Sequence, residues 1–203
     1  MNVAHPVEKK ILARIKSHKH AWVFTPSDFL NLGSRRAVDT ALFRLTKVGT
    51  IRRIAHGLYD IPRQHPIVGK TAPDIDMVVK ALAGKNATQL QPTGAYAANL
   101  LGLSDQVPAK VVFLTNGRSK HLRLGKLDIA LKQTSPRIMA TAGRISGLVI
   151  QAMRYLGKTH VNDETIKRLD RKLSASDRKQ LLKDVAYAPG WIADIMRHLG
   201  GQL

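Results

Sequence analysis

The chain has 203 residues, enough for one mid-sized domain or two small ones. It contains no cysteine, which excludes a disulfide scaffold, a thiol nucleophile and a zinc site built from thiolates. Lysine and arginine together number 33 against 14 aspartates and glutamates, giving a formal net charge of +19. A globular chain this basic is typical of proteins that bind a polyanion.

Nucleic acid fits as that polyanion better than a membrane surface does. Membrane binding calls for a basic amphipathic helix with bulky apolar anchors, and the chain has only two Trp and four Phe. No apolar run is long enough to span a bilayer, and the charged N-terminus does not have the pattern of an export signal. We therefore expect a cytoplasmic protein with no membrane partner.

Proline and glycine crowd the stretch from residue 61 to residue 73, which indicates a boundary. The sequence therefore predicts a DNA-binding domain over residues 1–66 and a second domain over residues 67–203. Residues 1–66 carry 12 lysines and arginines against 4 acids, so positive charge is denser in the first domain.

The first domain begins with helical patterns. Apolar spacing predicts a helix over residues 6–17, and residues 21–24 can form a short strand. Thr25, Pro26 and Asp28 form a helix-start signal, with Asp28 completing a capping box, and Gly33 ends that short helix. Ser34 is the expected N-cap of a further helix that runs to about Val48.

That last helix has two distinct faces. Val38, Ala41, Leu42 and Leu45 lie on one side and are expected in the core. The other side is cationic and is balanced by only one acid, Asp39. A solvated charged face is the plain alternative, but a short helix and a glycine turn before it are typical of a helix-turn-helix. Arginine there can bind guanine at two atoms, and Thr40 or Phe43 can contact a thymine methyl.

The segment 51–61 resembles a hairpin folded at His56-Gly57. A hairpin directly after a recognition helix is a wing, whose cations contact phosphate or the minor groove. The alternative for His56 is a turn residue with no ligand. The expected DNA-binding residues of helix and wing are Ser34, Arg35, Arg36, Thr40, Arg44, Lys47, Arg52, Arg53 and His56.

The second domain has mixed patterns. One helix is expected to begin at Pro73-Asp74, and a second runs from Thr93-Gly94 to Gly102. Three more are expected over about 143–156, 162–173 and 175–199. Strand-like runs cover 110–114, 121–124 and 127–131, and Asn116-Gly117 predicts a hairpin turn. The fold class is therefore α+β: an N-terminal winged helix-turn-helix, then an α+β domain with a small sheet and a helical tail.

Further cations lie on the predicted turn and strands of that sheet. Arg118, Lys120 and Arg123 form a possible second polyanion contact, and Lys126 and Lys132 lie nearby. The alternative is that they only keep the surface charged. The tail mixes acids and bases at i,i+4 spacing, which is typical of a solvated helix.

No catalytic set emerges from the sequence. No metal-binding histidine pattern occurs, and no cofactor motif is complete. Asp74 and Asp76 faintly suggest a metal-dependent nuclease, but acids in the first turn of a helix are explained by capping and the helix dipole. We therefore expect no enzyme, no cofactor and no metal.

Two stretches resemble a known family. IRRIAHGLYDIP, at residues 51–62, is similar to the N-terminal domain of AbiEi-family antitoxins of type IV toxin–antitoxin systems. QPTGAYAANLLGLSDQVPAKVVFLTNG, at residues 91–117, resembles a motif of that family's C-terminal domain, and LGKLDIALKQTSPR, at residues 124–137, continues the pattern. The similarity covers about residues 7–140.

The resemblance implies a repressor of its own operon that binds inverted repeats in promoter DNA through the winged helix. It also implies an antitoxin whose second domain counters a co-encoded nucleotidyltransferase toxin. The alternative is a stand-alone winged-helix transcription regulator with a sensing or dimerisation domain. The operator sequence, the oligomeric state and direct toxin contact do not follow from the sequence.

Overall fold

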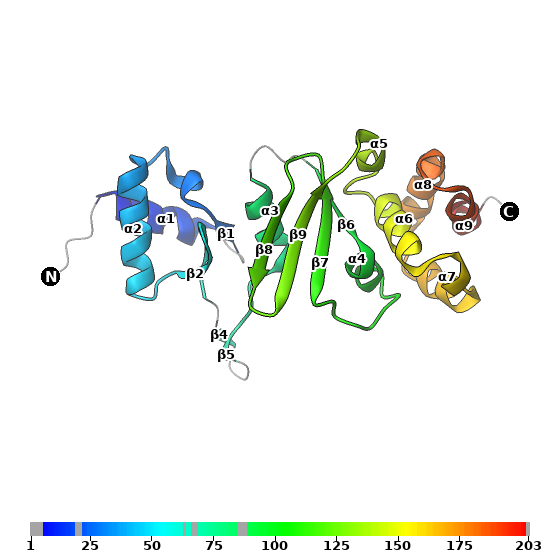
Figure 1. Ribbon diagram of the computed structural model, residues 1–203, viewed down its shortest axis with the longest axis horizontal. Helices are drawn as coiled ribbons and strands as arrows, with labels where there is room; N and C mark the ends of the chain where they lie inside the picture. Colours follow the sequence, from blue (N-terminus) through cyan, green and yellow to red (C-terminus); the bar gives the residue numbers. More distant parts are fainter. Residues whose placement is uncertain (1–5, 19–21, 63, 66–68, 85–88, 202–203) are drawn as a thin grey trace. The chain divides into compact units, whose positions relative to one another are not determined.

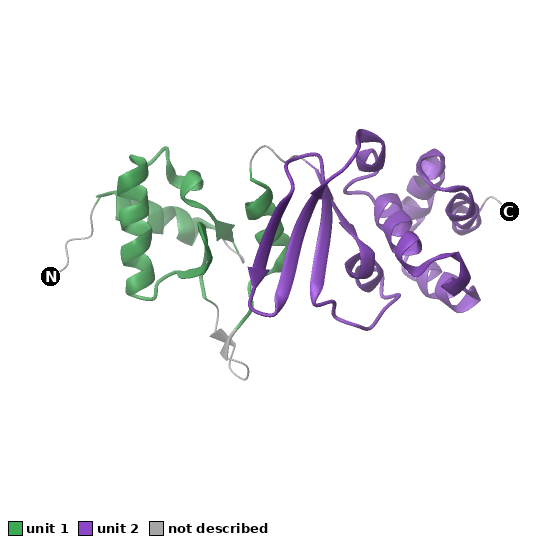
Figure 2. Cartoon of the chain, viewed as in Figure 1, with its two compact units in different colours: residues 1–84 green, residues 85–203 purple. Residues whose placement is uncertain are grey.

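The computed structural model describes residues 6–18, 22–62, 64–65, 69–84 and 89–201. The chain divides into two compact units, residues 1–84 and residues 85–203 (Figure 2). Helices and strands occur in both, so the fold is mixed α+β. The division falls after Gly84 rather than after residue 66, because helix α3 (Ile75–Ala83) packs on two strands of the first unit.

The first unit is built on three helices that begin where the sequence predicts. They are α1 (Pro6–Ser17), the 3₁₀ helix η1 (Pro26–Phe29) and α2 (Arg35–Lys47) (Figure 1). At η1 the Asp28 carboxylate accepts the backbone N–H of Thr25 at 2.8 Å, as the capping signal predicts. The buried side chains of these helices and the adjoining strands form one core, made of Ile11, Ile15, Phe24, Phe29, Val38, Ala41, Leu42, Leu45 and Ile51.

A small antiparallel sheet completes the first unit. Its strands are β1 (Val23–Phe24), β2 (Arg52–Ala55) and β3 (Leu58–Asp60), in the order β1-β3-β2. Gly57 has φ +68°, a left-handed conformation that suits glycine in the tight β2–β3 turn. The expected hairpin is therefore present. The strand expected over 21–24 is confirmed at its last two residues, while residue 21 lies outside the described residues.

Two further short strands, β4 (Gln64–His65) and β5 (Gly69–Lys70), pair with each other antiparallel. They form a sheet of their own, separate from β1-β3-β2. The proline- and glycine-rich stretch therefore connects two parts of the first unit, and the boundary between the two units lies further along the chain.

The second unit contains a four-stranded sheet in the order β6-β7-β9-β8 (Figure 1). Strands β7 and β9 pair in parallel, and the other neighbours are antiparallel. Alternate positions of β7 and three successive residues of β9 are buried, so these two strands form the buried centre of the sheet. The strands are β6 (Leu90–Thr93), β7 (Lys110–Thr115), β8 (Lys120–Leu124) and β9 (Leu127–Gln133).

The hairpin expected at Asn116-Gly117 is wrong. Strand β7 pairs with β6 on one side and β9 on the other, so the strand that follows the turn cannot pair with it. The Thr115 hydroxyl holds the turn locally, because it accepts the N–H of Gly117 at 3.0 Å and donates to the carbonyl of Gln89 at 3.1 Å. The hairpin of this sheet is β8–β9, which turns at Gly125 with φ +60°.

Helices form a second layer of the unit. Helix α6 packs on α4, β6, α8 and α9, and these contacts surround the larger apolar core of the chain. None of the helices among the described residues is both long and apolar enough to cross a bilayer. The helices are α4 (Gly94–Leu100), α5 (Pro136–Met139), α6 (Ile145–Leu156), η2 (Lys158–His160), α7 (Asp163–Asp170), α8 (Ala175–Asp184), η3 (Val185–Tyr187) and α9 (Gly190–Gly200).

Helix α8 begins with a capping box. Ser174 accepts the N–H of Asp177 at 3.2 Å, and the Asp177 carboxylate accepts the Ser174 hydroxyl at 2.7 Å and its backbone N–H at 2.9 Å. These hydrogen bonds, the side-chain one first, lower the pKa of Asp177.

We expect Ser174→Ala to cost about 1 kcal/mol of stability at neutral pH because the helix loses its cap. A lowered carboxyl pKa stabilises the fold above the pKa of the unfolded chain, and that contribution is lost as pH falls through the folded value. The difference between wild type and variant should therefore shrink below about pH 4. Urea unfolding at neutral and acidic pH, followed by Trp191 fluorescence in a Trp22→Phe background, measures it. A difference that grows on acidification would contradict the capping role.

Gly147 lies in the first turn of α6, where the helix packs closely against the turn that precedes it in the chain. A Cβ at this position would collide with the backbone carbonyl oxygen of Thr141 and with the side-chain oxygen of Gln91. We expect Gly147→Ala to destabilise the second unit by about 1–3 kcal/mol, since a backbone carbonyl cannot rotate away as a side chain can. The urea midpoint measures this, with Gly190→Ala as control because a Cβ there meets open space.

Candidate nucleic-acid interface

Helix α2 is oriented by its cap and its apolar face. The Ser34 hydroxyl accepts the N–H of Ala37 at 3.3 Å, so this predicted contact residue is also the N-cap. The predicted core face is confirmed, because Val38, Ala41, Leu42 and Leu45 are all buried. The opposite face of α2 is therefore turned to solvent.

The outward face of α2 is strongly cationic. Arg36, Thr40, Arg44 and Lys47 are exposed along it, and so is Phe43, at 61%. The Lys47 ammonium lies 5.6 Å from the centre of the Phe43 ring. This face thus combines positive charge, a hydroxyl and an accessible aromatic ring.

The arginines of α2 differ in their partners. Arg35 donates to Asp39 at 2.8 Å, four residues along the same helix, with both side chains about half exposed or more. Within the described part of the chain, the side chains of Arg36 and Arg44 have no hydrogen-bond or ion-pair partner. Such exposed i,i+4 pairs contribute only about 0.5 kcal/mol, so Arg35 can exchange Asp39 for another anion at small cost.

A shallow groove of about 270 Å³ runs along this part of α2. Val7 of α1 forms one wall, and a Cβ on Gly33 would touch that valine at 3.0 Å. Sequence reasoning did not predict the groove, because nothing local in the pattern indicates how α1 crosses α2. Its lining residues are Val7, Ser34, Arg36, Ala37, Thr40, Ala41 and Arg44.

The β2–β3 turn presents two further predicted residues. Arg53 and His56 are both exposed, and the Arg53 guanidinium lies 2.9 Å from the Nδ1 atom of His56. The connection to α2 is short and ordered, because the N–H groups of Thr50 and Ile51 both donate to the carbonyl of Leu45. Backbone hydrogen bonds therefore tie the start of the hairpin to the end of α2.

Arg52 differs from its neighbour. Its Nε and Nη2 atoms donate to the two carboxylate oxygens of Asp60, at 2.9 and 2.6 Å, and Nη2 also donates to the carbonyl of Thr71 at 3.1 Å. The Asp60 side chain is only 7% exposed, and its hydrogen bond raises the pKa of Arg52. Arg52, expected at the DNA, is thus engaged inside the unit, and the signal for this was its cross-strand position opposite Asp60.

The second group of predicted cations lies at an edge of the larger sheet. Lys120 and Arg123 are on β8, which has a neighbour on one side only, and Arg118 lies in the turn before it. All three are exposed. Because side chains alternate along a strand, Lys120 and Arg123 point to opposite faces, so the strand does not gather them on one surface.

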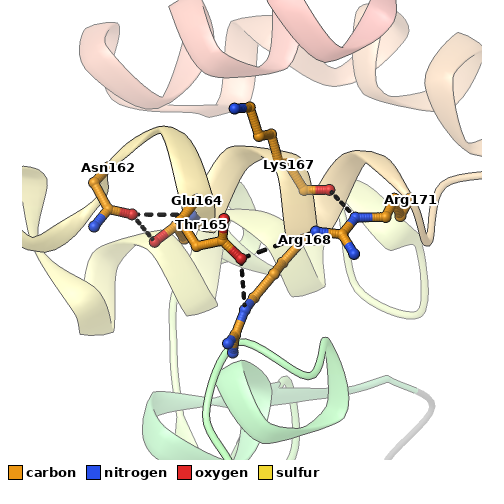
Figure 3. Close-up of polar contacts among 6 residues, drawn as sticks. All are labelled: Asn162, Glu164, Thr165, Lys167, Arg168 and Arg171. Atoms are coloured by element: carbon orange, nitrogen blue, oxygen red, sulfur yellow. Dashed lines mark hydrogen bonds and ion pairs between the residues drawn. The ribbon is translucent and has the colours of Figure 1, made fainter.

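Two arginines at α7 lie beside a glutamate of the same helix (Figure 3). Asn162 caps the helix by accepting the N–H of Thr165 at 3.0 Å. Glu164 lies 3.3 Å from the Nε atom of Arg168 and 3.9 Å from an Nη atom of Arg171. This agrees with the solvated helical face that the spacing indicates.

The aspartates that suggested a nuclease lie on α3. Asp74 is the N-cap and accepts the N–H of Met77 at 3.0 Å, as a capping role predicts. Asp76 follows in the first turn. Across the described residues, no three histidine, aspartate or glutamate side chains come together in a way that could hold a metal ion.

These features define a mixed α+β protein of two compact units, the first of which has a cationic helix beside a hairpin. The chain belongs to the DUF6088 family, a family of unknown function whose model matches residues 10–181. No curated protein matches it. Among solved structures it is similar to the RV2827C protein from Mycobacterium tuberculosis, with a TM-score of 0.48 and 14% identity over 97% of this chain and 78% of that one.

Proposed function

We propose that the first unit is a winged helix-turn-helix that binds DNA in a sequence-specific manner. The observation that carries this proposal is the outward face of α2, where Arg36 and Arg44 are exposed without partners beside Thr40 and Phe43. Helix α2 is the recognition helix and lies in the major groove, while η1 and the turn before it fill the role of the preceding helix.

In this proposal the contacts divide into two kinds. Arg36, Thr40, Phe43 and Arg44 read base edges, with guanidinium groups on guanine and the ring or methyl group on thymine. Ser34, Arg35 and Lys47 at the ends of the helix face, with Arg53 and His56 on the wing, contact the phosphate backbone. Arg52 holds the wing in place through Asp60 and does not contact DNA.

We further propose that the protein represses its own operon and acts as a type IV antitoxin against a co-encoded nucleotidyltransferase. This part is supported by the resemblance of residues 91–117 to the AbiEi family. That stretch forms most of β6, then α4 and β7, in the second unit. The nucleotidyltransferase is a functional partner, and the proposal does not require that the two proteins touch.

Co-expression tests the antitoxin role. A nucleotidyltransferase encoded beside this gene should arrest growth when expressed alone, and this protein supplied from an unrelated promoter should restore growth. Arg36→Ala should still restore it, because the change affects operator contact only. A regulator without antitoxin function predicts no rescue by either protein, even where operator binding is intact.

A further inference from the structure

A small cavity of about 80 Å³ lies in the second unit, whereas the residues assigned to DNA belong to the first. Its lining comes from four parts of the chain: helix α5, the turn between α5 and α6, one face of α6, and η3. Seven side chains line it: Arg137, Ile138, Thr141, Ile150, Gln151, Arg154 and Tyr187.

Two arginines lie at this cavity without a counter-charge. Two other arginines of the second unit are paired: Arg144 donates to Asp184 at 2.9 Å, and Arg178 donates to Asp170 at 2.6 Å. The side chains of Arg137 and Arg154, by contrast, have no hydrogen-bond or ion-pair partner among the residues that the structure describes. None of the described residues that line the cavity carries a carboxylate, so neither positive charge is neutralised by them.

The floor of the cavity supplies further donors. Thr141 and Gln151 are buried, at 3% and 7% exposure. The Thr93 hydroxyl donates to the Oε1 atom of Gln151 at 2.8 Å, which fixes the amide so that its NH₂ group is left to donate. Ile138 and Ile150 contribute apolar surface beside these donors, and a hydrogen bond from a charged donor is stronger than one from a neutral donor.

We propose that this cavity binds the phosphate group of a small molecule. The two guanidinium groups can donate hydrogen bonds to the oxygens of a tetrahedral anion, and the Thr141 hydroxyl and the Gln151 amide can donate to the same group. A planar carboxylate has too few oxygens to satisfy this set of donors. The site is independent of the proposed DNA interface, since all its residues belong to the second unit.

The cavity suits a terminal phosphate rather than a polymer backbone. Of the described residues that line it, two are cations, whereas binding along a nucleic-acid strand needs a row of them in a groove. Tyr187, 41% exposed at the edge of the cavity, provides a surface for the organic part of a phosphate ester.

Isothermal titration calorimetry on the full-length protein tests the site with two probes, inorganic phosphate and adenosine 5′-monophosphate. Ionic strength is held constant with sodium chloride, and adenosine serves as the uncharged control. We expect saturable binding at a single site. Tighter binding of the nucleotide would identify a phosphate ester as the ligand, and equal or tighter binding of inorganic phosphate would identify the free ion.

Arg137→Gln and Arg154→Gln should each weaken that binding by about tenfold or more, because each removes charge-assisted hydrogen bonds. Both side chains are exposed and unpaired, so neither change should disturb folding, which circular dichroism checks. Arg168→Gln removes the same charge from α7 outside the cavity and should leave binding unchanged. Equal weakening by all three variants, or no saturable binding by wild type, would overturn the proposal.

Discussion

Replacing Arg52 with alanine is expected to destabilise the first unit by about 3–5 kcal/mol, while leaving any DNA-contacting surface intact once the protein is folded. The guanidinium binds both oxygens of Asp60 and the carbonyl of Thr71, and its removal leaves a carboxylate that is only 7% exposed without a counter-charge. Arg52 itself is 29% exposed, which places the expected loss toward the lower end of that range.

The chain offers a clean way to measure this effect. Trp22 packs against the core of the first unit and Trp191 against that of the second, so a Trp191→Phe background reports unfolding of the first unit alone. Arg53→Ala is the matched control, with the same change of residue on the same strand but no acidic partner. It should leave the urea midpoint unchanged and weaken DNA binding.

A double-mutant cycle with Asp60→Asn separates the pair from its surroundings. We expect Arg52→Ala combined with Asp60→Asn to be less destabilised than the two single losses added together, because the buried charge has been removed. If Arg52→Ala unfolded at the wild-type urea concentration and weakened DNA binding as Arg53→Ala does, Arg52 would be a phosphate contact after all.

The second large effect concerns the two unpaired arginines of α2. We expect Arg36→Ala and Arg44→Ala each to weaken binding of the operator by about 1–3 kcal/mol, and to relax the preference at one base pair. Neither side chain has a partner inside the protein among the described residues, so stability should not change. Fluorescence anisotropy on the operator and on single-base variants of it measures both effects.

Two controls make this result specific. Lys179→Ala removes one positive charge from the exposed face of α8 and should change affinity only slightly. Arg53→Ala should weaken binding to all sequences alike and reduce the salt slope by about one, as loss of one phosphate contact predicts. If Arg36→Ala and Arg44→Ala also weakened all sequences equally, α2 would not be reading bases.

Local signals in the sequence were sufficient for much of the first unit. The spacing of apolar residues predicted α1, and Ser34 predicted the start of α2 because a cap acts over three residues. The turn at Gly57 was also predictable, because its positive φ depends on a single residue and glycine adopts it without strain. The exposed and buried faces of α2 followed from helical periodicity alone.

Non-local pairing was beyond the sequence patterns. Asn116-Gly117 is a hairpin signal, yet β7 pairs in parallel with β9, and the choice of neighbour is made by the whole sheet. The cavity beside Arg137 and Arg154 depends on how α5, α6 and η3 pack, which no short motif indicates. The pairing of Arg52 with Asp60 was within reach, because a turn at His56-Gly57 places these two residues opposite each other.

The most direct test of DNA recognition is a gel shift on the DNA immediately upstream of the protein's own coding sequence, beside an unrelated fragment of equal length, over a series of salt concentrations. The net charge of +19 makes some binding to both fragments expected at low salt. Our account predicts that a discrete complex with the upstream DNA persists at salt concentrations that release the unrelated fragment. Equal loss of both complexes as salt rises would contradict it, because the protein would then be a basic protein without an operator.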